Sequence, residues 1–120
     1  MKYMLTMHMD PVLWEGLPED DKQAVYAGHG DFMKLLRESG ELVHTQALAE
    51  PEKSTTVKVR DGAPVLSEGP YLEHQEFVCG FYLVDVETRE RAIELAGLIP
   101  DAKHTAIEVR QVMFEQGLEM

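Results

Sequence analysis

The sequence has little cysteine, and this limits both its stabilisation and its chemistry. Cys79 is the single cysteine among 120 residues, so no internal disulfide can form. A chain of this kind suits a reducing compartment. Cys79 lies in the middle of an apolar segment, where a thiol is normally inert packing rather than a nucleophile.

Long apolar runs are also missing. None approaches the roughly 20 residues that a helix needs to cross a bilayer. Residues 1–5 are followed by His8, Asp10 and Pro11, without a sustained hydrophobic region or a small-residue cleavage site. The sequence therefore predicts a cytoplasmic protein that neither crosses nor binds a membrane.

Basic residues are few. Eleven Lys and Arg stand against 22 Asp and Glu, which gives a net charge of −11. This charge repels a phosphate backbone and an acidic membrane surface. The basic residues form no patch interleaved with aromatics, so we expect no direct contact with nucleic acid.

Metal and phosphate motifs are absent as well. The five histidines show no close ligand spacing such as His-x-x-x-His. The glycine-rich segment around Gly28 and Gly30 follows acidic residues, which disfavours a phosphate cradle. We expect neither a metal nor a cofactor.

The strongest positive signal is a strand over residues 76–85, rich in aromatic and β-branched side chains. A turn at residues 67–71 precedes it, in which Gly69 is free to adopt a positive φ. Regular alternation divides the strand into two apolar faces, one with Phe77, Cys79, Phe81 and Leu83, the other with Val78, Tyr82 and Val84. Both faces must therefore be covered.

The other elements follow from periodicity and turn residues. We expect strands at 2–9, 41–48, 55–60, 63–66 and 105–113, helices at 18–39 and 87–97, and a linker at 12–16. The first helix is predicted to end at Gly40 and to bury Val25, Phe32, Leu35 and Leu36. His29 lies on the same stripe between Gly28 and Gly30, a pair that suggests a close approach or room beside the helix.

This order predicts an α+β fold, a single domain over residues 1–120. It is the ferredoxin-like βαββαβ pattern with an inserted β-hairpin, in which strands 2–9 and 76–85 lie side by side at the centre. Two helices cover only one face of such a sheet. Because the other face is also apolar, we expect a homodimer whose sheets pack face to face.

Four segments carry a family resemblance: the opening strand at residues 1–5, Thr-Thr-Val-Lys-Val-Arg-Asp-Gly at 55–62, Ser-Glu-Gly-Pro-Tyr at 67–71, and Gly-Phe-Tyr-Leu-Val-Asp-Val at 80–86. Together they resemble the YCII-related family in its DGPF branch, with Glu68 and Tyr71 in place of Asp and Phe. The resemblance implies a dimeric α/β barrel and an association with alternative sigma factor systems.

The resemblance also implies a histidine–aspartate site in some members. His29 matches the family's histidine in the first helix. The family's aspartate directly precedes a proline after the second helix, but here Ile99 precedes Pro100. Asp101, on the other side of this proline, is the candidate substitute.

Three functions remain open. The first is a small-molecule-binding accessory or regulatory homodimer, its apolar pocket lined by His8, Trp14, Phe32, His74 and Tyr82. The alternative is a lyase- or isomerase-type enzyme with His29 as general acid/base, and the third is a structural partner of a regulator. An enzyme needs a carboxylate within hydrogen-bond reach of His29. Structural explanations compete in each case: core packing for His29 and Trp14, and a surface or capping role for His8 and His74.

Overall fold

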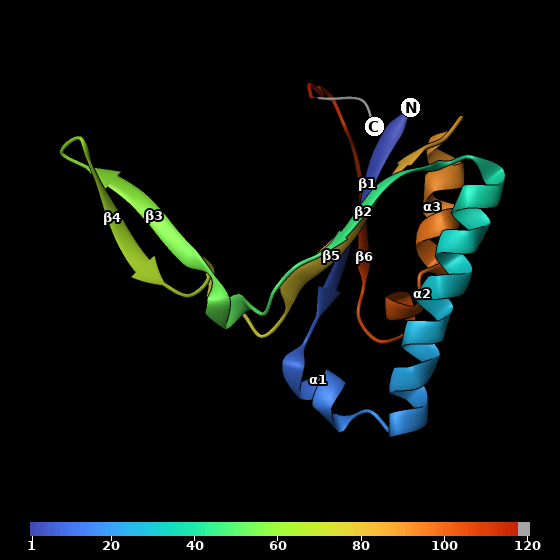
Figure 1. The fold of residues 1–120 in the computed structure, drawn as a ribbon, viewed down its shortest axis with the longest axis horizontal. Coiled ribbons are helices and arrows are strands. Elements are labelled where there is room, and N and C mark those ends of the chain that lie inside the picture. The colour runs from blue at the N-terminus through green and yellow to red at the C-terminus, as the bar shows by residue number, and fades with distance from the viewer. Residues whose placement is uncertain (118–120) are drawn as a thin grey trace.

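The computed structural model describes residues 1–117, so the last three residues of the predicted domain lie outside the described part. The elements follow the predicted order (Figure 1). They are β1 (Lys2–Met9), α1 (Pro11–Gly16), α2 (Glu19–Ser39), β2 (Leu42–Ala47), η1 (Pro51–Lys53), β3 (Thr55–Arg60), β4 (Ala63–Glu68), β5 (Phe77–Asp85), α3 (Arg89–Leu98), η2 (Pro100–Lys103) and β6 (Ile107–Gln111).

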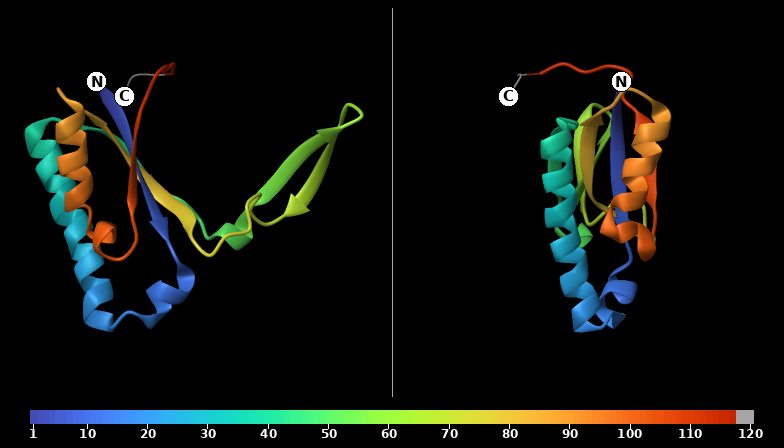
Figure 2. Two further views of the ribbon diagram at one scale, coloured as in Figure 1. Left: turned by 180° about the vertical axis from the view of Figure 1, so that it is seen from behind. Right: turned by 90° about the vertical axis from the view of Figure 1, so that its right-hand side faces the viewer.

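The main sheet has the strand order β2-β5-β1-β6, and every neighbouring pair is antiparallel. The two most apolar strands, β1 and β5, therefore lie at its centre, which confirms the predicted ferredoxin-like fold. The helices α2 and α3 pack on one face of this sheet, and no helix of residues 1–117 covers the opposite, bare face (Figure 2). The hairpin β3–β4 forms a separate two-stranded sheet that projects from the body as an arm (Figure 1).

The core lies between the sheet and the two helices. Strand β1 buries every second side chain, and α2 contributes Val25, Phe32 and Leu36. The prediction that Leu35 is buried is wrong, because this residue is 36% exposed. It lies one step, about 100°, around the helix from Leu36 and so falls at the edge of the buried stripe.

A β-bulge interrupts the pairing of the two central strands. Met7 pairs with Gly80 and His8 with Val78, which leaves Cys79 as an extra residue on β5. The predicted face with Phe77, Cys79, Phe81 and Leu83 is therefore wrong. Phe77 lies opposite buried Met9 on the helix side of the sheet, while beyond the bulge Phe81 and Leu83 point to the bare side.

The predicted linker at 12–16 is also wrong, because these residues form the short helix α1. Pro11 fits its first turn, and the Asp10 carboxylate accepts a hydrogen bond of 2.9 Å from the Val12 amide. Two glycine predictions are confirmed. Gly40 ends α2 with a φ of 77°, and Gly69 ends the arm with a φ of 100°.

Candidate functional site

The site begins where the middle of α2 meets η2. A Cβ atom added at Gly28 would lie 2.5 Å from Cγ of Pro100, so only glycine allows this approach. At Gly30 an added Cβ would have no heavy atom within 4 Å. Gly28 therefore permits a close contact, and Gly30 leaves open space beside the helix. The sequence suggested these two explanations for the pair of glycines.

The close contact brings together His29 and Asp101. The histidine Nε2 lies 2.7 Å from Oδ1 of Asp101. Asp101 is 4% exposed, and η2 holds it in place through hydrogen bonds that its carbonyl accepts from the amides of His104 and Thr105. The structure thus supplies the carboxylate that an enzyme would need, one residue after Pro100 instead of one before.

Tyr82 forms a hydrogen bond with the other ring nitrogen of His29. Its hydroxyl lies 2.7 Å from Nδ1 of His29, and the two ring planes are nearly parallel, with 15° between them and 5.9 Å between the ring centres. Phe32 meets the Tyr82 ring edge-on, with 4.9 Å between the ring centres. Burial, helped by the negative charge of Asp101, raises the pKa of Tyr82 to about 12, so its phenol keeps the proton near neutral pH.

Cys79 approaches the same carboxylate. The bulge turns it toward the helices, and its Sγ lies 4.0 Å from Oδ2 of Asp101 and 3.6 Å from the carbonyl oxygen of Met7. Burial, and then the charge of Asp101, raises the pKa of this thiol to about 11. Cys79 is therefore a neutral thiol near pH 7, in keeping with the interpretation of it as packing.

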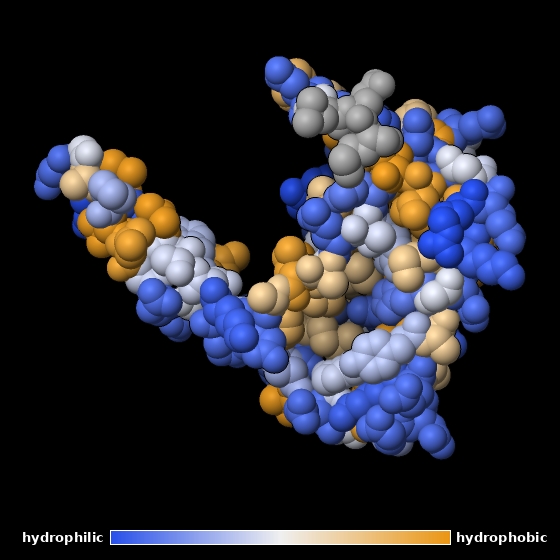
Figure 3. All heavy atoms as spheres, viewed as in Figure 1, coloured by the Kyte–Doolittle hydropathy of each residue, from blue (hydrophilic) through white to orange (hydrophobic). Residues whose placement is uncertain are grey.

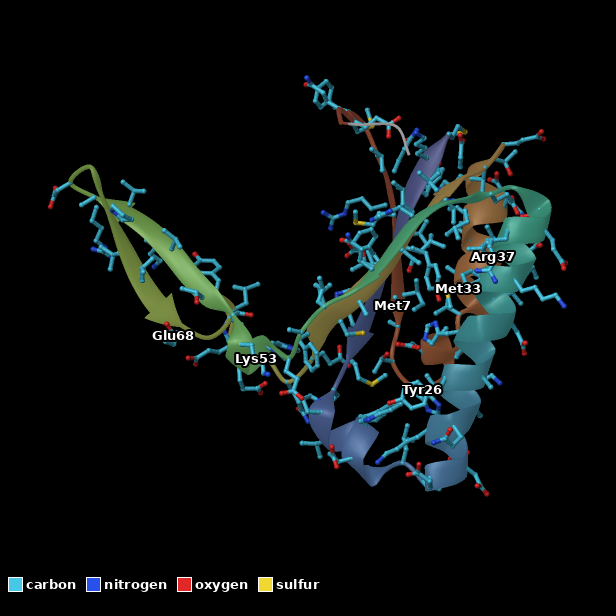
Figure 4. The ribbon with its side chains drawn as sticks, in the orientation of Figure 1. Met7, Tyr26, Met33, Arg37, Lys53 and Glu68 are labelled. Carbon is cyan, nitrogen blue, oxygen red and sulfur yellow. The ribbon has the colours of Figure 1, made fainter. Side chains whose placement is uncertain are left out.

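The surface is hollowed between α2 and the sheet, above α1 (Figure 3). The side chains of Met7, Tyr26 and Met33 lie around this hollow (Figure 4). Trp14 comes from α1 and meets Tyr26 edge-on, with 5.7 Å between the ring centres. Sequence reasoning missed Tyr26 and Met33, although both lie at helical spacing from His29, three residues before it and four after it.

The remaining predicted residues lie elsewhere. His8 pairs with Val78 on the bare side of the sheet, away from the helices. His74 is exposed in the loop before β5, where its Nδ1 accepts a hydrogen bond of 3.1 Å from the Glu76 amide. The structure thus joins His29, Asp101, Tyr82 and Phe32, with Trp14 against Tyr26, and leaves His8 and His74 out.

Within residues 1–117, no three His, Cys, Asp or Glu side chains are grouped so that they could hold a metal ion. Two further hollows lie at the base of the arm and between the end of α2 and the start of α3. None of the predicted site residues lines either of them.

The family model for the YCII-related domain matches residues 1–115, nearly the whole chain. No curated protein matches the sequence. In the part of the chain that the structure describes, no helix has the length and apolar character needed to cross a membrane.

Proposed function

This chain belongs to the YCII-related family, and we propose that it transfers protons on a small organic substrate, as an enzyme of the lyase or isomerase type. His29 is the general acid/base, and Asp101 orients its ring. The observation that supports this function is the 2.7 Å contact between Nε2 of His29 and the buried carboxylate of Asp101.

The roles follow from the position of each group. The imidazole of histidine changes charge near neutral pH, so it can accept and return a proton there. When His29 becomes positively charged, the carboxylate of Asp101 beside Nε2 stabilises that charge. The burial of Asp101 strengthens the attraction. With its side chain 22% exposed, His29 is the accessible member of the pair. It lies on α2 between Tyr26 and Met33, whose side chains surround the hollow that receives the substrate (Figure 4).

The accessory or regulatory role favoured by the sequence needs a ligand pocket but no carboxylate. A buried carboxylate is costly unless it is paired, and a histidine within hydrogen-bond reach of a carboxylate is the arrangement that general acid–base catalysis uses. The pair thus favours the enzyme over passive binding. Ligand binding without turnover, the DGPF branch and the association with an alternative sigma factor system stay predictions.

We also propose that the protein works as a homodimer, with the bare faces of two sheets packed together in an α/β barrel. Phe81 and Leu83 lie on this face, and Val78 beside them is 43% exposed. On the arm, Val57, Val59 and Leu66 are exposed on a hairpin that has no core of its own. A second copy would cover apolar surface on both parts.

Hydrogen exchange in D₂O tests the proposed reaction. Cyclohexanone and pyruvate serve as cyclic and acyclic carbonyl probes, and mass spectrometry follows deuterium uptake next to the carbonyl. We expect uptake above the buffer rate, and a loss of about 100-fold or more in His29→Asn and in Asp101→Asn.

The matched control is His44→Asn, since His44 lies opposite Leu83 on the bare side of the sheet. It should exchange at the wild-type rate. Uptake at the buffer rate for both probes, or equal rates in all four proteins, would contradict proton transfer by His29.

A further inference from the structure

Both ring nitrogens of His29 have a partner in the resting site. Oδ1 of Asp101 lies 2.7 Å from Nε2, and the Tyr82 hydroxyl lies 2.7 Å from Nδ1. An ionised carboxylate can only accept a hydrogen bond, whereas a phenol can donate or accept. A neutral imidazole has one nitrogen with a proton and one with a free lone pair. These partners therefore decide whether Nδ1 or Nε2 carries the proton.

We infer that Tyr82 is a positioning residue: its O–H donates to Nδ1 and holds neutral His29 in the tautomer whose proton lies on Nε2. Asp101 then accepts the Nε2 proton, and both short contacts are satisfied at once. With the proton on Nδ1 instead, Nε2 and the Asp101 carboxylate would face each other at 2.7 Å as two acceptors. The raised pKa of the phenol supports the same assignment, because the hydroxyl keeps the proton that it donates.

The surroundings of Tyr82 keep its hydroxyl in place. The residue is 2% exposed and pairs with Leu5 and Thr45 on the two neighbouring strands. Phe32 meets its ring edge-on, with 4.9 Å between the ring centres, and the His29 ring lies beyond the hydroxyl in a nearly parallel plane. This packing keeps the Tyr82 hydroxyl beside Nδ1 as long as the site holds no ligand.

In the resting site, the hydroxyl of Tyr82 therefore blocks Nδ1, the basic nitrogen of His29. The lone pair of Nδ1 is in use until a ligand displaces the Tyr82 hydroxyl. A ligand that offers an acceptor to this O–H and an acidic hydrogen to Nδ1 would replace both halves of the lost hydrogen bond. This inference goes beyond the proposed reaction, because it concerns the proton on His29 before any substrate binds.

Nitrogen NMR of the imidazole rings tests the tautomer, at a pH where free histidine is neutral. In the wild type we expect the His29 proton on Nε2, with Nδ1 giving the signal of an unprotonated nitrogen that accepts a hydrogen bond. In Tyr82→Phe the Nδ1 signal should move downfield, toward that of a free lone pair. Tyr26→Phe makes the same change three residues before His29 and should leave the signal in place.

A proton on Nδ1 in the wild type would overturn the inference, as would an unchanged Nδ1 signal in Tyr82→Phe. The wild-type spectrum decides the tautomer without any variant, so the test stands even if Tyr82→Phe does not fold.

Diethyl pyrocarbonate, which reacts with neutral imidazole nitrogen, tests whether the hydroxyl covers Nδ1. Mass spectrometry of peptides separates His29 from the other histidines, and exposed His74 is the internal reference. We expect the His29 rate to rise several-fold in Tyr82→Phe and to stay unchanged in Tyr26→Phe. An equal His29 rate in the wild type and in folded Tyr82→Phe would show that the hydroxyl does not cover this nitrogen.

Discussion

Two glycines beside His29 show how single residues build the site. Gly28 faces Pro100 across a gap that cannot hold a methyl group, whereas Gly30 faces open space. The first permits the contact between α2 and η2 that places Asp101 against His29. Gly30 touches nothing that would require a glycine. Replacing it therefore changes only the helix propensity, whereas replacing Gly28 also changes the contact with Pro100.

Gly28→Ala should destabilise the protein and Gly30→Ala should stabilise it. Alanine gains about 0.5–1 kcal/mol over glycine inside a helix, and only this gain applies at position 30. At position 28, the added methyl group forces α2 and η2 apart, at a cost of about 1–3 kcal/mol. Urea denaturation of the two variants measures the difference. Equal stabilities would mean that Pro100 moves aside freely.

Tyr82 should make the stability depend on alkaline pH. Its pKa is raised from an ordinary value of 10.0 to about 12, so the folded state favours the protonated phenol. The resulting stabilisation is fully present below pH 10 and is lost as the pH rises toward 12, by about 2–3 kcal/mol in all. The free energy of unfolding should therefore fall more steeply with pH in the wild type than in Tyr82→Phe. Parallel curves would contradict the raised pKa.

At the scale of elements, one ion pair joins α3 to the start of β2. Arg91 binds both carboxylate oxygens of Glu41, with Nε–Oε2 and Nη2–Oε1 distances of 3.0 and 2.8 Å, and it also contacts Glu94. The hydrogen bond from Arg91 lowers the pKa of Glu41. The pair therefore connects α3 to the segment between the end of α2 and the start of β2.

Replacing Arg91 by Lys should cost about 1 kcal/mol at neutral pH, because an ammonium group cannot bind both oxygens in this planar geometry. A lowered carboxyl pKa stabilises the fold above the ordinary pKa of Glu, and this stability is lost as the pH falls and Glu41 becomes protonated. The cost should therefore shrink in acid. Arg89→Lys, in the exposed first turn of the same helix, is the control. An equal loss in both variants would rule out a special role for the pair.

The molecule as a whole has two apolar surfaces that its own described residues leave uncovered. One is the bare face of the sheet, and the other is the face of the arm that carries Val57, Val59 and Leu66. The arm projects on the side of the sheet opposite the helices (Figure 2). A partner that covers the sheet would therefore also lie within reach of the arm.

Sedimentation at micromolar concentration should give about twice the chain mass of 13.6 kDa. Leu83→Glu places a charge on the bare face and should reduce the mass to that of one chain, since an unpaired charge in an apolar interface is strongly unfavourable. Ile93→Glu is the matched control, because Ile93 on α3 is apolar and 43% exposed. A folded wild-type monomer, or dissociation in both variants, would contradict the barrel.

Much of the architecture could be predicted because its signals are local. Periodicity, turn residues and the two most apolar strands were enough to place β1 and β5 at the sheet centre. The bulge at Cys79 could not be predicted, since it arises from the pairing of β5 with a strand about 70 residues earlier. It reverses the faces of β5, so Tyr82 and Cys79 both point toward the helices.

For the site, the sequence by itself determined that His29 lies on the inner side of the first helix, because helical spacing relates it to Val25 and Phe32. Only the tertiary structure decided what His29 meets there. Asp101 is 72 residues away along the chain and Tyr82 is 53, so neither contact with His29 can be inferred from local sequence pattern. Asp101 reaches His29 because Gly28 lets Pro100 lie against α2, a contact that exists only once the two halves of the fold have packed together.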